Sequence, residues 1–386
     1  MPDKGTHSSI GGRSEPVFSP ALPESEEHTI PTFDYPCPCG LYVQRVSFGD
    51  SPAESCEQAR EGTNRVLKIS KICRAVAAGA ALAAGLTTIP VAAGVAAAAP
   101  LNGDDRNGTY LALGDSVAFG YQPSDATPAP DYNHPRNFVS YANYVATDLG
   151  ERVTNASCPG ETTASMLNVT AISNGCENTL GTGGGYRTAY PLHVQYSGSQ
   201  MAYAVKYLTD HSDGTSLVTI DIGANDGFVC EELGECSTRA GLEAALHQIS
   251  VNLHDILGQI RGTGFQGPLV LLNYYSTAPY KDPTQAAAVA LTVMLNQALD
   301  AATTGYNVII ADGFGAFAKA ASGTVTDDPC AAGLLIKVSS TPLECNIHPS
   351  RLGHQVLAAS IENALAKAGD QKAGEGTPGG RRPRGE

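Results

Sequence analysis

Positive charge is scarce in this chain of 386 residues. Lys and Arg together number 24 against 38 Asp and Glu, which gives a formal net charge of −14. A protein that binds nucleic acid neutralises phosphates with clustered cations, so this balance argues against a nucleic-acid partner. Charged residues make up only 16% of the chain and hydrophobic residues 42%. That apolar content is enough for at least one sizeable core and excludes a wholly disordered chain.

Motifs of several other protein classes are absent. No GK[ST] phosphate loop occurs, which argues against a kinase. The segment GTGGGY at 181–186 lacks both the G-x-G-x-x-G spacing and a strand-then-helix setting, which argues against a dehydrogenase. No HExxH occurs, and none of the six cysteines after residue 100 lies in a CxxC pair. Metal binding by these cysteines is therefore disfavoured.

Charge is missing altogether from residues 75–103, directly after the basic residues Arg65, Lys68, Lys71 and Arg74. A basic start, an Ala-rich stretch and the small residues 96–99 predict a secretory signal peptide over 65–99, which is removed on export. A membrane anchor is the alternative, but Ala, Gly, Thr and Pro make the stretch only weakly hydrophobic. We therefore expect a secreted or cell-envelope protein.

The two flanks differ in composition from the middle of the chain. Residues 1–64 are rich in Pro, Ser and Glu without periodicity, and we interpret them as a disordered extension or a wrongly assigned start. Residues 367–386 are rich in Gly, Pro and charge, which predicts a disordered tail. Residues 100–366 remain as the folded domain and carry 11 basic and 25 acidic side chains.

Six cysteines fall in this predicted domain, and an even number in an exported chain favours disulfide bonds. They form three pairs that are close in sequence. We predict bonds between Cys158 and Cys176, Cys230 and Cys236, and Cys330 and Cys345.

From residue 109 onward, short apolar runs alternate with longer amphipathic stretches, the pattern of a parallel sheet with connecting helices. The predicted strands are 110–113, 152–156, 217–222, 268–274 and 307–311. The predicted helices are 137–149, 198–211, 239–261, 283–303 and 350–365. The fold class is therefore α/β, a three-layer αβα sandwich with a central five-stranded parallel sheet. In such sheets the site lies at the carboxyl ends of the strands.

Four candidate residues lie in loops, three of them directly after predicted strands. Ser116 stands in LGDSVAFG after the first strand, but Ala118 replaces the second glycine of a G-x-S-x-G elbow. Gly160 (NASCPGETTAS) precedes a short helical stretch where a backbone N–H can bind an oxyanion. Asn225 (IGANDGF) can place an amide at the same point, and His348 (ECNIHPS) precedes the last helix.

Taken together and in this order, these four fragments resemble the SGNH (GDSL) hydrolase family over about residues 109–365. The resemblance implies a flavodoxin-like fold and a serine esterase or lipase without a metal or organic cofactor. It implies Ser116 as nucleophile, His348 as general base, and Ser116, Gly160 and Asn225 as the oxyanion hole. The implied partner is a small-molecule or lipid ester, with an acylated glycan as the alternative, and we expect a monomer.

One position departs from the family, which commonly has Asp three residues before the histidine, where this chain has Cys345. A histidine base needs an acceptor on its other ring nitrogen. Asn346, Glu344, Asp327, Asp328 and a backbone carbonyl are all open candidates. We predict a Ser-His dyad helped by one of them, and a catalytically silent envelope-binding protein is the rival reading.

Neighbouring residues receive plainer interpretations. Asp115 is expected to brace the turn before Ser116. Asp226 beside Asn225 could shape the oxyanion loop, although solvent exposure is the simpler account. The Gly- and Tyr-rich loop 175–198 either walls a substrate cleft or covers the sheet edge. Tyrosines near strand ends either line a pocket or pack at its rim: Tyr186, Tyr190, Tyr196, Tyr274, Tyr275 and Tyr280.

Overall fold

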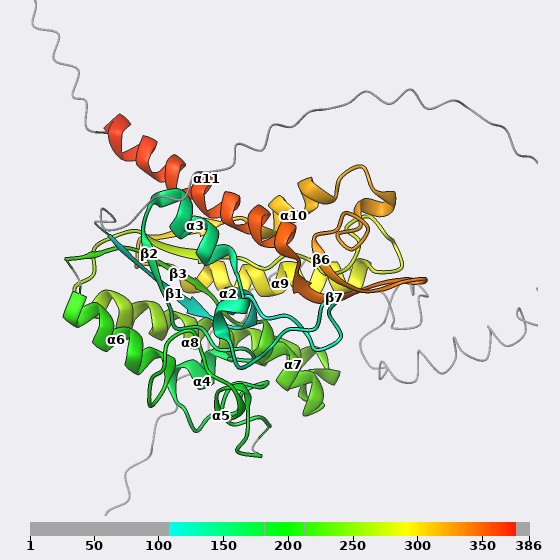
Figure 1. Cartoon of the computed structure of the whole chain (residues 1–386), viewed down its shortest axis with the longest axis horizontal. Helices are drawn as coiled ribbons and strands as arrows, with labels where there is room; N and C mark the ends of the chain where they lie inside the picture. The colour runs from blue at the N-terminus through cyan, green and yellow to red at the C-terminus, as the bar shows by residue number, and fades with distance from the viewer. Residues whose placement is uncertain (1–107, 181, 212, 376–386) are drawn as a thin grey trace, which may run out of the picture. The chain divides into compact units, whose positions relative to one another are not determined.

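A parallel sheet forms the centre of a computed structural model that describes residues 108–180, 182–211 and 213–375 (Figure 1). Its five strands run in the order β2-β1-β3-β4-β5. They are β1 (Thr109–Gly114), β2 (Arg152–Asn155), β3 (Thr215–Asp221), β4 (Leu269–Leu272) and β5 (Val308–Ala311). Every strand ends within two residues of its predicted bounds, so the predicted α/β class and parallel sheet are confirmed.

Burial explains why these segments form strands. In β1 every residue from Tyr110 to Gly114 is buried, because the strand lies inside the sheet and is covered on both faces. Such strands appear in the sequence as continuous apolar runs. β2 lies at the sheet edge, where Arg152 is exposed.

Helices cover both faces of the sheet, which gives three layers (Figure 1). One side carries α3 (Tyr141–Leu149), α10 (Gly313–Ala321) and α11 (Arg351–Glu375), and the other carries α6 (Gln200–His211), α8 (Arg239–Gly262) and α9 (Ala286–Ala302). In α8 the buried residues recur at helical spacing: Ile249, Leu253, Ile256, Leu257 and Ile260. The Thr238 side chain caps its start by accepting from Gly241 N.

Several elements were not predicted. They include α7 (Ala224–Glu232) and a separate antiparallel hairpin of β6 (Leu335–Ser340) and β7 (Leu343–Pro349). The hairpin has no continuous apolar run, because much of it is exposed or only half-buried. The short elements are α2 (Ser116–Phe119), η2 (Pro135–Asn137), α4 (Thr163–Leu167), α5 (Tyr186–Ala189), η3 (Glu235–Ser237) and η4 (Val325–Asp327).

Three disulfide bonds join the predicted cysteine pairs. Cys158–Cys176 links the loop after β2 to the long loop before α6. Cys230–Cys236 joins α7 to η3, and Cys330–Cys345 ties β7 to the loop before β6.

The C-terminal helix runs further than expected. α11 continues to Glu375, so residues 367–375 are helical and the prediction of a disordered tail from 367 is wrong for this part. Ala, Lys and Gln favour helix here, and the first proline comes only at Pro378. The extension 1–64, the signal peptide 65–99 and residues 376–386 lie outside the described residues. Within the described part, no helix combines the length and apolarity needed to cross a bilayer.

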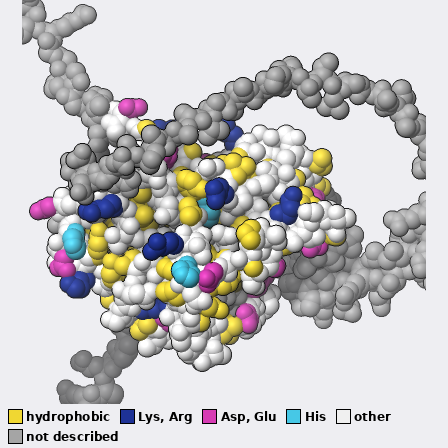
Figure 2. Space-filling view, in the orientation of Figure 1, with side chains coloured by type: hydrophobic (Ala, Val, Ile, Leu, Met, Phe, Trp, Pro, Cys, Tyr) yellow, Lys and Arg dark blue, Asp and Glu magenta, His cyan; other side chains and the backbone are white. Residues whose placement is uncertain are grey.

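Figure 2 shows one face of the molecule in the orientation of Figure 1. Its Lys and Arg side chains are scattered over this face. Positive charge is therefore not concentrated at one place on this face.

Candidate active site

Ser116 begins α2 directly after β1. At Gly114, where φ is +133°, an added Cβ would lie 2.1 Å from the backbone oxygen of Asp221, so only glycine fits there. Asp115 caps the short helix, because its Oδ1 accepts from Val117 N at 2.9 Å. This turn places the Ser116 side chain at the carboxyl edge of the sheet, as in other open α/β sheets.

His348 reaches Ser116 from the hairpin. Its Nε2 lies 2.9 Å from Ser116 Oγ, although 232 residues separate the two in sequence. The ring of Tyr121 packs against the imidazole at a centroid distance of 4.9 Å. Burial lowers the pKa of His348 to about 4. The imidazole is therefore neutral at neutral pH and can accept the serine proton.

Asn346 is the acceptor on the other side of this imidazole. Its Oδ1 lies 2.5 Å from His348 Nδ1 and also accepts from the His348 backbone N–H at 3.1 Å. A backbone N–H only donates, which identifies this atom as the amide oxygen and puts the imidazole proton on Nδ1. Nε2 is then free to accept from Ser116. Alternate side chains of a strand share a face, which brings Asn346 beside His348.

The other side-chain candidates for this role are exposed or have other partners. Glu344 is exposed on β7. Asp328 Oδ1 accepts from Cys330 N at 2.8 Å, and Asp327 pairs with Lys281 at 2.8 Å. Cys345 is held in its disulfide. The acceptor is thus a neutral amide in place of the family's carboxylate.

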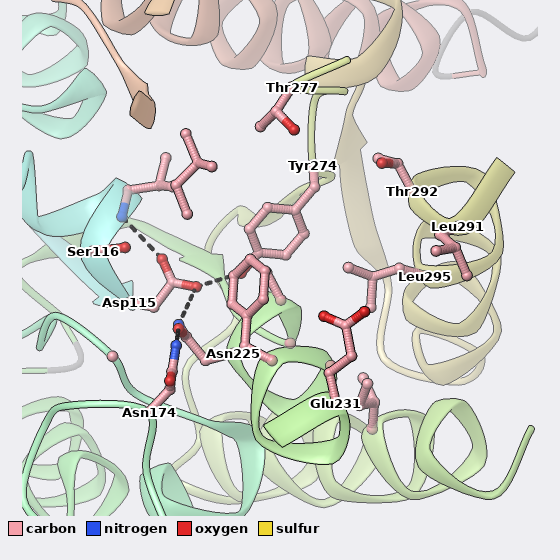
Figure 3. Close-up of a pocket in the computed structure, with 18 of the residues that line it drawn as sticks. Asp115, Ser116, Asn174, Asn225, Glu231, Tyr274, Thr277, Leu291, Thr292 and Leu295 are labelled. Carbon is pink, nitrogen blue, oxygen red and sulfur yellow. Dashed lines mark hydrogen bonds between the residues drawn. The ribbon is translucent and has the colours of Figure 1, made fainter. Parts of the chain in front are cut away.

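Asp115 connects three parts of the site (Figure 3). Besides Val117 N, it accepts at Oδ2 from Tyr274 OH at 2.5 Å and from Asn225 Nδ2 at 3.1 Å. Its carboxyl is buried, and this burial raises its pKa to about 6. Asp115 braces more than the turn, because it also holds the Asn225 side chain.

Ser116, Gly160 and Asn225, the three residues expected to donate to an oxyanion, line one cavity. Gly160 has φ +81°, and its N–H has no hydrogen-bond partner among the described residues. Asn225 lies in the first turn of α7, after Gly223 with φ +124°. Donors from the ends of β1, β2 and β3 thus meet at one edge of the sheet.

Asp226 is not solvent-exposed as expected. Its carboxylate accepts from Thr163 N at 2.9 Å and from Thr163 Oγ1 at 2.5 Å. This contact ties α7 to α4, and burial raises the pKa of Asp226 to about 6. The expectation failed because α4 packs on α7, a tertiary contact that the local sequence does not indicate.

A buried carboxyl next to Gly160 was missed altogether. Glu161 accepts from Ser165 Oγ at 2.5 Å and from Gln200 Nε2 at 3.0 Å. Gln200 also pairs with the backbone of Gly114, through its Oε1 at 2.7 Å and its Nε2 at 3.0 Å. Burial raises the pKa of Glu161 to about 8. These contacts link the Gly160 turn to the Ser116 turn, and no sequence motif points to them.

Glu161 also belongs to the one grouping of potential metal ligands among the described residues, with Cys158 and Cys176. The two cysteines are bonded to each other. They offer no thiolate, so this grouping is not a metal site.

The cavity beside Ser116 has a volume of about 780 Å³, within the range of ligand pockets. One part contains the polar groups described above. The rest extends between α7, α8 and α9, and aliphatic or aromatic side chains line it: Ala224, Phe228, Leu242, Ala245, Leu246, Ile249, Leu291 and Leu295. Figure 3 shows Leu291, Thr292 and Leu295 from α9 facing this space, and Glu231 from α7.

Some of the tyrosines near strand ends line the cavity, and the others pack outside it. Tyr274 and Tyr275 line the cavity, as do Gly175 and Tyr186 of the long loop, which therefore forms part of the cavity wall. The others pack elsewhere: Tyr190 against Tyr132, Tyr196 with its hydroxyl on Ala156 O, and Tyr280 with its hydroxyl on Phe314 O.

Comparisons with known proteins give one family. The sequence profile of the GDSL-like Lipase/Acylhydrolase family matches residues 112–356, more than half of the chain. A search of curated protein sequences returned no significant match.

Among solved structures, the chain is similar to an extracellular lipase from Streptomyces rimosus, with 19% identity, a TM-score of 0.42 and coverage of 67% of this chain and 99% of that one. It is also similar to a putative GDSL-like lipase from Parabacteroides merdae, with 13% identity, a TM-score of 0.41 and coverage of 68% of this chain and 96% of that one. A third similar structure is an acetylxylan esterase from Geobacillus stearothermophilus, with 15% identity, a TM-score of 0.40 and coverage of 67% of this chain and 94% of that one.

The profile match begins in β1, four residues before Ser116, and continues past His348 into α11. It therefore includes all four residues on which the sequence resemblance rests. This chain belongs to the GDSL-like lipase/acylhydrolase family and is a carboxylic ester hydrolase.

Proposed function

We propose that the protein cleaves carboxylic esters through an acyl-enzyme on Ser116, with His348 as general base and acid. The observation that carries this proposal is the 2.9 Å contact between Ser116 Oγ and His348 Nε2 beside the cavity. A serine becomes a useful nucleophile when such a base accepts its proton.

The reaction has two halves. Ser116 Oγ attacks the ester carbonyl carbon while its proton moves to His348 Nε2, and the carbonyl oxygen becomes an oxyanion. When the carbon–oxygen bond to the alcohol breaks, His348 returns the proton to the leaving alcohol. A water molecule, deprotonated by His348, then attacks the acyl-enzyme and releases the carboxylic acid and Ser116.

The oxyanion is proposed to bind the N–H groups of Ser116 and Gly160 and the amide of Asn225. The Asn225 amide nitrogen uses one hydrogen on Asp115, which leaves its second hydrogen for the substrate. Such preset donors are worth about 2.7–4 kcal/mol each in the transition state.

Asn346 is proposed to orient His348 in this cycle. A neutral amide fixes the tautomer and the ring orientation, but it stabilises an imidazolium less than a carboxylate does. We therefore expect an active enzyme with a weaker base than a Ser-His-Asp triad. The direct contact with Ser116 favours this activity over a silent binding protein.

The apolar part of the cavity is proposed to hold the acyl chain. A deacetylase needs room for two carbons, whereas the space between α7, α8 and α9 is lined by side chains suited to a longer chain. Acyl groups longer than acetyl are therefore the preferred substrates, and carbohydrate O-acetyl esters are the alternative.

Export is also part of the proposal. Three disulfide bonds are typical of proteins that leave the reducing cytosol. The predicted signal peptide over 65–99 agrees with this. N-terminal sequencing of the protein from its native host is expected to find a mature start near residues 96–104, and a start elsewhere would contradict export by this signal.

The test of the activity uses the full-length chain with its disulfides formed. Hydrolysis of p-nitrophenyl acetate, butyrate, octanoate and palmitate is compared for the native protein, for Ser116→Ala and for Ser322→Ala, which changes an exposed serine outside the cavity. We expect turnover to vanish only in Ser116→Ala, and kcat/KM to be higher for butyrate or octanoate than for acetate. Turnover that survives in Ser116→Ala would overturn the serine mechanism, and a maximum at acetate would favour the deacetylase.

A further inference from the structure

Asn174, which lies between α4 and α5, contacts both Gly160 and Asn225. Its backbone N–H donates to Gly160 O at 2.8 Å, and its side-chain Nδ2 donates to Asn225 Oδ1 at 2.8 Å. Gly160 follows β2 and Asn225 follows β3. One residue from a third segment therefore links two of the three proposed oxyanion donors.

The hydrogen bond from Asn174 determines how the Asn225 amide is turned. An ionised carboxylate only accepts hydrogen bonds, so Asp115 requires the nitrogen end of this amide. The oxygen end then faces Asn174, which supplies its donor. Without that donor, the oxygen of a side chain that is only 5% exposed loses its partner, and the orientation of the amide is no longer fixed from both ends.

The segment that carries Asn174 is itself fixed against Gly160. Ser173 is buried, and its Oγ accepts from Cys176 N at 3.1 Å and from Glu177 N at 3.2 Å. The Cys158–Cys176 bond joins the segment to the loop that contains Gly160. A Cβ added to Gly160 would lie 2.6 Å from Gly175 Cα, which shows how closely the two backbones pack.

We propose that Asn174 is a positioning residue whose side chain fixes the Asn225 amide beside the Gly160 N–H, so that the two donors can bind one oxyanion. This inference rests on the proposed function. Asn174 also lines the cavity, but its side-chain amide donates to Asn225 Oδ1, so the side chain acts through Asn225. Its removal therefore lowers the rate of the chemical step and leaves substrate binding nearly unchanged.

The test compares Asn174→Ala and Asn174→Asp with Asn178→Ala. Asn178 lies in the same loop and donates to Thr170 O at 2.9 Å, so its substitution removes a similar hydrogen bond away from Asn225. We expect kcat to fall about 10-fold in Asn174→Ala with KM nearly unchanged. Asn174→Asp is expected to lose more, because its carboxylate faces the Asn225 oxygen. Asn178→Ala should retain native kcat.

A double-mutant cycle with Asn225→Ala separates positioning from a general structural role. If Asn174 acts through Asn225, the Asn174→Ala change costs much less in the Asn225→Ala background than in the native one. Equal losses in both backgrounds, or native kcat in Asn174→Ala, would overturn the inference. Thermal melting of each variant checks that the fold is retained.

Ser116→Ala is assayed beside these variants to separate this inference from the proposed function. If Ser116→Ala keeps its turnover, the proposed function fails. If Ser116→Ala is inactive and Asn174→Ala is fully active, only this inference fails.

Discussion

The two sides of the proposed active site are built differently. On the proposed oxyanion side, Ser116, Gly160 and Asn225 follow strands of the central sheet, and the buried carboxylate of Asp115 holds Asn225. On the histidine side, His348 lies on a hairpin outside that sheet, and a neutral amide holds it. Gly160 and Asn225 on the first side are buried and Asn225 is held by a carboxylate, whereas His348 and Asn346 on the second side are half-buried and the histidine is held by a neutral amide.

The difference indicates which side of the site tolerates substitution. Several hydrogen bonds and the Cys158–Cys176 bond fix the oxyanion side, so its residues depend on one another. The imidazole depends on a single acceptor two residues away on the same strand, and the Cys330–Cys345 bond ties that strand down. The family's usual Asp can therefore be absent while the imidazole keeps its orientation.

The largest expected effect comes from removing the base. His348→Ala is expected to lower kcat by about 10⁴-fold, because Ser116 then has no proton acceptor. His211→Ala, which changes an exposed histidine at the end of α6, serves as the control. Steady-state kinetics on p-nitrophenyl butyrate measure both variants, and a loss below about 100-fold would contradict the role of His348.

On the oxyanion side, removing the Asn225 amide is expected to cost less. Asn225→Ala should lower kcat by about 10²- to 10³-fold, since one preset donor is lost while two remain. Measured kcat and KM decide this prediction: a change confined to KM would mean that Asn225 binds the substrate rather than the oxyanion.

The disulfide bonds extend the comparison to stability. The cysteines of Cys158–Cys176 are 18 residues apart, and those of Cys330–Cys345 are 15 residues apart. Replacing both cysteines of one of these pairs by serine should lower the free energy of unfolding by about 3 kcal/mol. The Cys230–Cys236 pair, six residues apart, is the matched control with an expected cost of about 2 kcal/mol. Urea denaturation measures all three, and an unchanged midpoint for either longer loop would show that the bond does not stabilise its side.

The smallest effect on kcat is expected from giving the histidine side a charge. His348 must be neutral to act as base, so native kcat/KM should fall as the pH drops through about 4. Asn346→Asp places a carboxylate beside Nδ1, which favours the imidazolium and raises the pKa of His348. Activity should then be lost at a higher pH, while kcat at pH 8 rises about 10-fold.

The control for this prediction is Glu344→Gln, which changes an exposed carboxyl of the same strand. Its pH profile should match that of the native enzyme. An unchanged profile in Asn346→Asp would show that Asn346 does not orient the imidazole.

The sequence predicted the placement of Ser116, Gly160 and Asn225 better than the surroundings of His348. Ser116, Gly160 and Asn225 each follow an apolar run, and the carboxyl ends of parallel strands must meet at one edge. The acceptor for His348 stayed open among five candidates, because the hairpin that places Asn346 beside it has no apolar pattern of its own.

Contacts between segments that are distant in sequence could not be predicted from the sequence. Asn174 meets Asn225 across 51 residues, and Gln200 meets Gly114 across 86 residues, without a motif at either end. Asp226 was misjudged for the same reason, since its partner Thr163 lies on another helix. Tertiary packing determines such contacts, and the spacing of residues within a short segment does not indicate them.

The most direct test of the central claim, an acyl-enzyme on Ser116, is covalent labelling with diethyl p-nitrophenyl phosphate followed by peptide mapping. The account predicts one adduct per chain, located on Ser116, with a labelling rate that falls as the pH drops through about 4. An adduct on another residue, or none on a protein that hydrolyses esters, would contradict it.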